Sequence, residues 1–179
     1  TLMATSDIKD AFYSQLRDQV LSTSNSDYLC ILGDFNARIG TDNSAWHDVI
    51  GPYGVGTMNE NGQWLLEFCA ANKLCVPSTY FQGPFRAKVT WMHPRSKRWH
   101  QLDHIIVRRD DLKSVLQIRS MHSADCDTDH ALIRCRVVCS PKKIHRACPK
   151  PQPKINTSAC NEPEKLAVFH NQLSTAFDS

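Results

Sequence analysis

The chain has 179 residues, of which 41% are hydrophobic and 22% are charged, with 21 lysines and arginines against 18 aspartates and glutamates. This length and composition fit one globular domain with a continuous core, and they argue against a disordered chain. No apolar run approaches the roughly 18 residues that a membrane-spanning helix needs, which excludes a transmembrane protein. The net charge of +3 is too small to identify a nucleic-acid-binding protein, so the placement of the charges carries more information.

Apolar periodicity places the elements of the first half of the chain. From Ser6 onwards, apolar residues recur every four positions, which is typical of an amphipathic helix. The continuous apolar run over 28–32 predicts a strand buried on both faces, and Asn61 is expected to cap the following helix. In chain order, the expected elements are a helix over 6–20, a strand over 28–32, a glycine-rich surface loop over 37–60, a helix over 61–69, and short strands over 74–76 and 88–92.

The second half predicts further strands and then a change of composition. Residues 131–138 alternate between apolar and charged side chains, which indicates a half-buried strand. From Ser140, prolines interleave with lysines and arginines, which predicts a basic, extended linker. The expected order is a strand over 101–107, a helical turn after Asp110, strands over 116–121 and 131–138, and an amphipathic helix over 162–177. We therefore expect a folded domain over 1–139, a linker over 140–161 and the start of a following helical region over 162–179.

The eight cysteines form no CxxC pair. Cys30 and Cys135 lie inside apolar, strand-like runs, where a free thiol acts as a small hydrophobic side chain. Because a chain of this size builds a core without disulfides and shows no secretory signal, we expect reduced thiols in an intracellular protein. The alternative is a zinc site with a ligand spacing that matches no standard pattern, formed by Cys135, Cys139, His145 and Cys148.

Three polar segments border predicted strands: Gly-Asp-Phe-Asn at 33–36, Gln-Leu-Asp-His at 101–104 and Thr-Asp-His at 128–130. If these strand ends converge, one cleft holds carboxylates, an amide and an imidazole. Such groups suit phosphodiester hydrolysis, which needs a positioned water, a partner for charge on the phosphate oxygens and usually a divalent metal held by carboxylates. In extended geometry, Asp34 and Asn36 point to the same side, so Asn36 can donate to a phosphate while Asp34 orients water.

Each segment also has a structural explanation. Asp and Asn after a strand are common turn formers, and Trp91 is equally well explained as a core aromatic. The cationic turn of Arg95, Lys97 and Arg98 is either a contact for nucleic-acid phosphates or a solvated hairpin tip. Asp103 is harder to explain structurally, because an ionised carboxylate among apolar strand residues needs a partner.

The order of these motifs resembles the endonuclease/exonuclease/phosphatase superfamily, which includes DNase I. The resemblance covers roughly residues 7–138. More specifically, four segments look like craniofacial development protein 2-like sequences, which are related to the endonuclease domains of non-LTR (LINE-type) retrotransposons: Leu32–Arg38, Leu66–Cys69, Thr90–Lys97 and Ile106–Arg109.

The resemblance implies a role for each matching residue. Asp34 would position the attacking water, and Asn36 would contact the scissile phosphate. Asp103 would orient His130, which would act as the base or as the phosphate partner. Asp129 would contribute to a metal or phosphate site. The nucleic acid would lie near the side chains of Trp91, Arg95, Lys97 and Arg98.

The resemblance also implies an α/β fold. Two β-sheets would pack face to face and be flanked by helices, in the four-layer α/β/β/α arrangement of DNase I-like proteins, here incomplete. The family domain normally begins with a strand that carries an Asn and then a metal-binding Glu, for which no residue here can be assigned. We therefore expect an N-terminally truncated domain that is inactive alone. His104 is a second departure, because a Tyr usually follows the Asp.

Taken with these residues, the resemblance implies a metal-dependent, DNA-nicking endonuclease of a retrotransposon-derived nuclear protein, with Mg²⁺ or Mn²⁺ as cofactor and DNA as partner. A reverse transcriptase often follows in proteins of this kind, so a downstream domain of that type is an implied partner. Two alternatives stay open. One is a small-molecule phosphoesterase of the same superfamily, and the other is a catalytically inactive scaffold that binds a partner.

Overall fold

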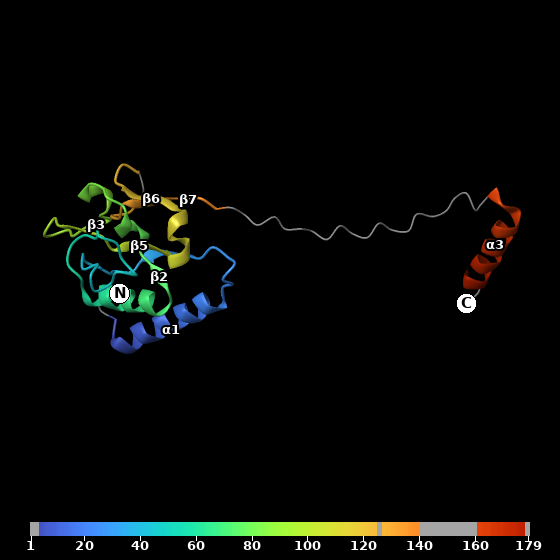
Figure 1. Cartoon of the computed structure of the whole chain (residues 1–179), viewed down its shortest axis with the longest axis horizontal. Coiled ribbons are helices and arrows are strands. Elements are labelled where there is room, and N and C mark those ends of the chain that lie inside the picture. The colour runs from blue at the N-terminus through green and yellow to red at the C-terminus, as the bar shows by residue number, and fades with distance from the viewer. Residues whose placement is uncertain (1–3, 125–126, 140–160, 178–179) are drawn as a thin grey trace. The chain divides into compact units, whose positions relative to one another are not determined.

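The computed structural model describes residues 4–124, 127–139 and 161–177. It divides into two compact units, Thr1–Ser140 and Pro141–Ser179 (Figure 1). Nearly all of the predicted linker lies outside the described residues, as do two ligands of the alternative zinc site, His145 and Cys148. Within the described ranges, no helix has the length and apolar character needed to cross a bilayer.

A three-stranded antiparallel sheet in the order β1-β5-β2 forms the centre of the first unit. Its strands are β1 (Cys30–Asp34), β5 (Asp103–Arg108) and β2 (Leu74–Cys75). The helices α1 (Ser6–Ser22) and α2 (Glu60–Ala71) lie together on one side of this sheet (Figure 1). Both helices occur where the apolar periodicity predicted them.

The helical side of the sheet carries the larger apolar core. Leu65 and Leu66 of α2 are fully buried there, together with Ile106 of β5. Tyr13 and Leu16 of α1 pack against this cluster. The apolar face of α2 therefore packs on the sheet. Only the second half of the α1 stripe, Leu16 and Val20, joins this core, whereas Ile8 and Phe12 are exposed. This burial fixes β1 and β5, the strands whose ends carry the predicted site.

A second antiparallel pair, β6 (Val115–Met121) and β7 (Leu132–Val137), packs on the opposite face. Ile105 and Val107 of β5 are buried against residues of this pair, including Ile133. Two sheets thus pack face to face with helices on the outer side of one of them. This mixed α/β architecture is the one that the sequence predicted.

Shorter elements connect the layers. The 3₁₀ turns η1 (Pro77–Tyr80), η2 (Phe85–Ala87) and η3 (Arg109–Ser114) pack against β5 or β6. The strands β3 (Trp91–Met92) and β4 (Trp99–His100) form a separate hairpin. Its first residue, Trp91, makes an isolated antiparallel bridge with His130, so the hairpin lies against the segment that leads into β7.

Two local expectations were wrong. The predicted strand over 28–32 lies two residues later and is not buried on both faces, since Leu32 is 66% exposed. The strand is at the sheet edge and pairs only with β5, and an apolar run alone does not distinguish an edge strand from a central one. The cap of α2 is Asn59 rather than Asn61, because the Asn59 side chain accepts a hydrogen bond from the backbone N–H of Gly62.

The second unit contains the helix α3 (Pro163–Phe177) at the place where the sequence predicted an amphipathic helix. Its apolar stripe is exposed and consists of Leu166, Phe169, Leu173 and Phe177.

Candidate active site

The two strand-end aspartates lie on neighbouring strands of the central sheet. Asp34 is the last residue of β1 and Asp103 is the first residue of β5, and the two are direct partners in the antiparallel register. The two strands therefore each place a carboxylate at the same end of the β1–β5 pair. This pairing places the first two predicted motifs side by side, although 68 positions separate them in the sequence.

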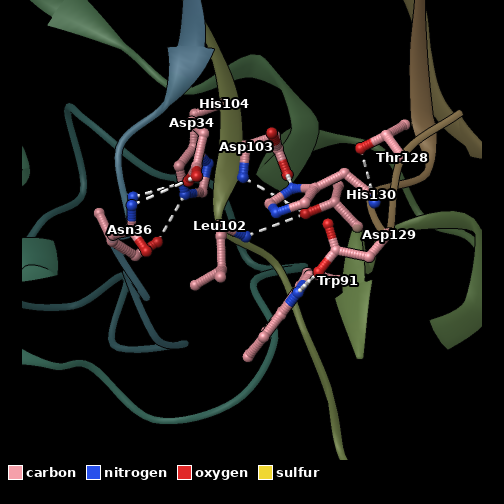
Figure 2. A network of polar contacts seen from close by, with 11 residues as sticks. Asp34, Asn36, Trp91, Leu102, Asp103, His104, Thr128, Asp129 and His130 are labelled. Atoms are coloured by element: carbon pink, nitrogen blue, oxygen red, sulfur yellow. Dashed lines mark hydrogen bonds and ion pairs between the residues drawn. The ribbon is translucent and has the colours of Figure 1, made fainter. Parts of the chain in front are cut away.

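Asn36 reaches Asp34 through a turn rather than through extended geometry. The Asn36 backbone N–H donates to Asp34 Oδ1 at 2.8 Å, and its side-chain Nδ2 donates to Oδ2 at 3.2 Å. Asn36 has φ of +50°, in the left-handed region that Asn tolerates better than most residues. The expectation of an extended Asp34–Asn36 segment was wrong, but the two side chains are in contact (Figure 2).

Three side chains hold this turn to the rest of the fold. Asn59 Nδ2 and Asn61 Nδ2, at the start of α2, both donate to the Asn36 carbonyl, at 3.1 and 3.3 Å. His104 Nε2 donates to the Ala37 carbonyl at 2.8 Å. The turn is thus fixed from the helix on one side and from β5 on the other.

His104 is the site residue whose role sequence reasoning missed. Its side chain is fully buried, and because its partner is a carbonyl oxygen, Nε2 carries the proton. Nδ1 is buried without a hydrogen-bond partner among the described residues. Burial lowers the pKa of His104 below the usual value, against the opposing effects of its hydrogen bond and of Asp103 and Asp34. The available signal was a histidine within the apolar run of β5.

Asp103 and His130 form a direct pair, the contact that the sequence predicted for them. His130 Nδ1 lies 2.8 Å from Asp103 Oδ2, and both side chains are largely buried (Figure 2). The buried Thr90 Oγ1 accepts the backbone N–H groups of Leu102 and Asp103, at 3.1 and 3.3 Å. Thr90 therefore fixes the start of β5, and Asp103 in turn fixes the ring orientation of His130.

Opposing effects set the charge of His130. Partial burial on its own would lower the pKa of this imidazole. The Asp103 hydrogen bond, followed by the charges of Asp103, Asp34 and Asp129, outweighs burial and raises the pKa above its usual value. The ring therefore favours the cationic form more than a free histidine does.

Asp34, Asp103 and His130 line one cavity of about 310 Å³. Thr128, whose hydroxyl accepts the His130 backbone N–H at 3.2 Å, lines it as well. Asn36 lies outside this set and is joined to it through Asp34. His130 Nε2 makes no hydrogen bond within the described part of the chain, so this nitrogen is available to a ligand.

Trp91 and Asp129 form a second pair beside the cavity. The indole Nε1 donates to Asp129 Oδ2 at 2.7 Å, and the Trp91 ring lies 6.2 Å from that of His130 (Figure 2). The indole hydrogen bond lowers the pKa of Asp129. Trp91 is also stacked on His100 at 6.3 Å. The tryptophan therefore lies next to the predicted catalytic imidazole and is only half-buried.

The predicted cationic turn connects β3 to β4. The side chains of Arg95, Lys97 and Arg98 are exposed and have no ion-pair partner among the described residues. The His93 ring fixes the turn from inside, since its Nδ1 accepts the backbone N–H groups of Arg95 and Ser96, each at 3.2 Å. The turn thus presents three cations on the hairpin that also carries Trp91.

A metal-binding cluster is not formed by the residues that the structure describes. Among them, no group of three or more His, Cys, Asp or Glu side chains is placed to hold a metal ion. The carboxylates of the site already accept hydrogen bonds: Asp34 from Asn36, Asp103 from His130 and Asp129 from Trp91. The described donor set alone therefore does not fit a resident Mg²⁺ or Mn²⁺.

No protein-family model matches the sequence. The chain is 32% identical over 161 residues to craniofacial development protein 2 of Bos taurus, across 90% of this chain and 27% of that protein. The chain is homologous to part of craniofacial development protein 2. The same protein of Tragulus javanicus is 36% identical over 122 residues, across 68% of this chain and 21% of the relative. The chain thus spans about a quarter of the length of these relatives.

A solved structure shares the fold. The 3′ phosphatase NExo from Neisseria, determined with a product DNA hairpin, aligns with a TM-score of 0.52 at 19% sequence identity. The alignment covers 73% of this chain and 52% of that protein. At this level of identity the similarity shows the fold alone, which is the DNase I-like fold that the sequence predicted.

Proposed function

We propose that the cavity is part of the active site of a phosphodiesterase that cleaves DNA, most simply a nicking endonuclease. The observation that carries this proposal is the 2.8 Å contact between Asp103 and His130 at a cavity that Asp34 also lines. Together these groups offer a carboxylate for water and an imidazole that is oriented by a second carboxylate.

Each group has a distinct role in the proposed reaction. Asp34 orients the attacking water and accepts its proton. His130, held cationic by Asp103, binds the scissile phosphate and stabilises the negative charge that grows on its oxygens. Asn36 donates the second N–H of its amide to the same phosphate, since the first is used by Asp34. The raised pKa of His130 supports a cationic role near neutral pH.

Two observations favour DNA over a small phosphoester. The half-buried Trp91 lies beside His130, and the exposed turn with Arg95, Lys97 and Arg98 extends from the same hairpin. An aromatic ring next to a cationic turn suits the bases and backbone of a nucleic acid. The Neisseria phosphatase that shares the fold was solved with a DNA hairpin, which is consistent with this choice.

The active protein in this proposal is longer than the 179 residues. The relatives are about four times as long as the segment matched. Leu32, on the edge strand β1, is exposed next to the site. We propose that a further segment completes the domain and supplies metal ligands, with Asp129 contributing to the Mg²⁺ or Mn²⁺ site. The retrotransposon origin, a downstream reverse transcriptase and a nuclear location belong to the same proposal.

A second candidate function is binding of DNA without cleavage. The observation that favours it is the lack of a metal-binding cluster among the described residues. In that case the cavity and the cationic turn bind nucleic acid, and the carboxylates only order the loops. The two functions differ in turnover, not in partner.

The deciding experiment measures Mg²⁺-dependent nicking of supercoiled plasmid by the full-length parent protein and its His130→Ala variant. Nicking that His130→Ala abolishes supports the endonuclease. Hydrolysis of small phosphoesters without nicking would favour a small-molecule phosphoesterase. Binding of plasmid without cleavage of any phosphoester would leave the binding function. We expect the 179-residue chain alone to show little turnover, and robust nicking by it would contradict the proposed need for a further segment.

A further inference from the structure

Trp91 contacts side chains of two different segments beside the cavity. Its ring lies 5.6 Å from the ring of His93 and 6.3 Å from the ring of His100, and both residues belong to the same hairpin as Trp91. The same indole lies 6.2 Å from the ring of His130, and its Nε1 donates to Asp129 Oδ2 at 2.7 Å. Trp91 therefore joins the hairpin to the segment that carries the proposed phosphate ligand.

His130 is held in place by contacts that do not need the indole N–H. The backbones of Trp91 and His130 form an isolated antiparallel bridge, and the Ala131 N–H donates to the Thr90 carbonyl at 2.7 Å. Asp103 fixes the imidazole through Nδ1. Loss of the indole N–H alone would therefore leave the segment and the imidazole in place and release only the side chain of Asp129.

The next residue along the chain is an alternative partner for the Asp129 carboxylate. The charge of Asp129 acts on the His130 ring, and Figure 2 shows the carboxylate between that ring and the Trp91 indole. Because Nδ1 is bonded to Asp103, the cationic ring has one N–H left, at Nε2, and this group makes no hydrogen bond within the described part of the chain. A released carboxylate beside a cationic N–H forms a charge-assisted hydrogen bond. Such a pair would occupy the nitrogen that the proposed reaction assigns to the phosphate.

We propose that Trp91 is a positioning residue, whose indole N–H holds Asp129 away from Nε2 of His130 and so keeps that nitrogen open to a phosphate oxygen. The inference rests on the proposed function, because it takes His130 as the phosphate ligand. It gives the indole nitrogen a role that a core aromatic lacks, since phenylalanine would keep a ring at this position but has no N–H to hold the carboxylate.

The test is a double-mutant cycle on the binding of inorganic phosphate, followed by the NMR signals of the His130 ring in the 179-residue chain without metal. At about pH 6, below the usual pKa of histidine, the ring is largely cationic in every variant. With Asp129 present, Trp91→Phe should weaken phosphate binding about threefold, the size expected when a partly exposed ion pair competes. Combined with Asp129→Ala, the same substitution should have no effect, because no carboxylate is left to compete.

Two matched controls separate this coupling from general effects. Asp10→Ala removes an exposed aspartate of α1, and Trp91→Phe should keep its full effect in that background. Trp99→Phe changes the other tryptophan of the hairpin, whose indole N–H makes no hydrogen bond to the described residues, and it should leave phosphate affinity unchanged. An equal loss in Trp99→Phe, no loss in Trp91→Phe, or a loss that persists with Asp129→Ala would overturn the inference.

A second measurement leaves Trp91 unchanged and so does not depend on the folding of its variant. The indole N–H signal of Trp91 should move in Asp129→Ala, which removes its acceptor, whereas the signal of Trp99 should stay. An unmoved Trp91 signal would overturn the inference, because the hydrogen bond would not exist. If phosphate shifts no His130 signal in the unmodified chain, the inference and the proposed role of His130 both fail. If phosphate binds at His130 and the cycle shows no coupling, the inference alone fails.

Discussion

Asp34 and Asp103 are direct cross-strand partners in the β1–β5 pair, and each carboxylate accepts hydrogen bonds from a different residue of the site. Asp34 accepts two hydrogen bonds from Asn36, while Asp103 accepts one from His130. The two carboxylates at the same end of the β1–β5 pair therefore have different partners, an amide for one and an imidazole for the other. This asymmetry assigns water activation to Asp34 and orientation of His130 to Asp103 in the proposed reaction.

Replacing Asp103 should lower the pKa of His130. Asp103→Asn removes the negative charge and the charge-assisted hydrogen bond that together outweigh the effect of burial on the ring. The measurement is an NMR pH titration of the His130 ring in the chain and in the variant. Asp10→Asn, an exposed aspartate on α1, is the control and should leave the titration in place. An unchanged or higher pKa in Asp103→Asn would show that the pair has no electrostatic effect.

The same pair makes stability depend on pH with a defined sign. The pKa of His130 is raised in the folded chain, so protonation of this ring stabilises the folded state relative to the unfolded state. This contribution is complete below the unfolded pKa of about 6.5 and is lost as pH rises through the higher folded value. The difference in unfolding free energy between the chain and Asp103→Asn should therefore shrink as pH rises above about 6.5. Urea unfolding across this range measures it, and a difference that grows with pH would contradict the assignment.

His104 should make the fold sensitive to acid. Burial lowers its folded pKa, so below about pH 6.5 the unfolded chain binds more protons and stability falls as pH drops. His104→Phe should remove this pH dependence and leave the Ala37 carbonyl without its donor, at a cost of about 1–3 kcal/mol near neutral pH. His104→Gln, which can still donate to that carbonyl, should recover part of this cost. Urea unfolding at several pH values tests both, and acid sensitivity that persists in His104→Phe would assign it to other groups.

Asn59 should contribute more to stability than its neighbour Asn61. Its Oδ1 accepts the N–H groups of Gly62 and Arg38, each at 2.8 Å, and its Nδ2 donates to the Asn36 carbonyl. Asn59→Ala therefore removes both a helix cap and an anchor of the site loop, and should cost about 2 kcal/mol. Asn61→Ala removes one hydrogen bond of 3.3 Å and should cost roughly 0.5–1 kcal/mol. Urea unfolding at neutral pH compares the two, and equal costs would refute the capping assignment.

The elements that the sequence predicted correctly are those set by local patterns. The apolar repeats from Ser6 and before Cys69 define α1 and α2, and the alternation before Val138 defines β7. The contact between Asp103 and His130 was also predictable, because each residue borders a predicted strand and a buried carboxylate needs a partner.

The features that the sequence did not predict depend on contacts between distant segments. His104 acquires its role from the Ala37 carbonyl, 67 positions away. A histidine within the apolar run of β5 signals burial, but nothing local to either residue identifies that partner. The exposure of Leu32 depends on which strands pair with β1, and the run of apolar residues is the same for an edge and for a central strand. The choice of Asn59 over Asn61 as the cap depends on where the chain leaves the loop, a boundary that patterns place only within a few residues.

The cationic turn should bind DNA through its arginines without sequence preference. Arg95 and Arg98 are exposed, whereas Lys97 has φ of +56°, in the left-handed region, so Lys97 is left in place to keep the turn residue unchanged. Arg95→Ala/Arg98→Ala is therefore the informative variant, and loss of two phosphate contacts should reduce the salt slope of DNA binding by about 2. Anisotropy titrations of unrelated duplex sequences should show a uniform loss, because phosphate contacts carry no sequence information. The Arg17→Ala/Lys113→Ala variant, which has the same net charge, should bind DNA as the parent does. An equal loss of affinity in this variant would show that the turn acts only through the net charge of the protein.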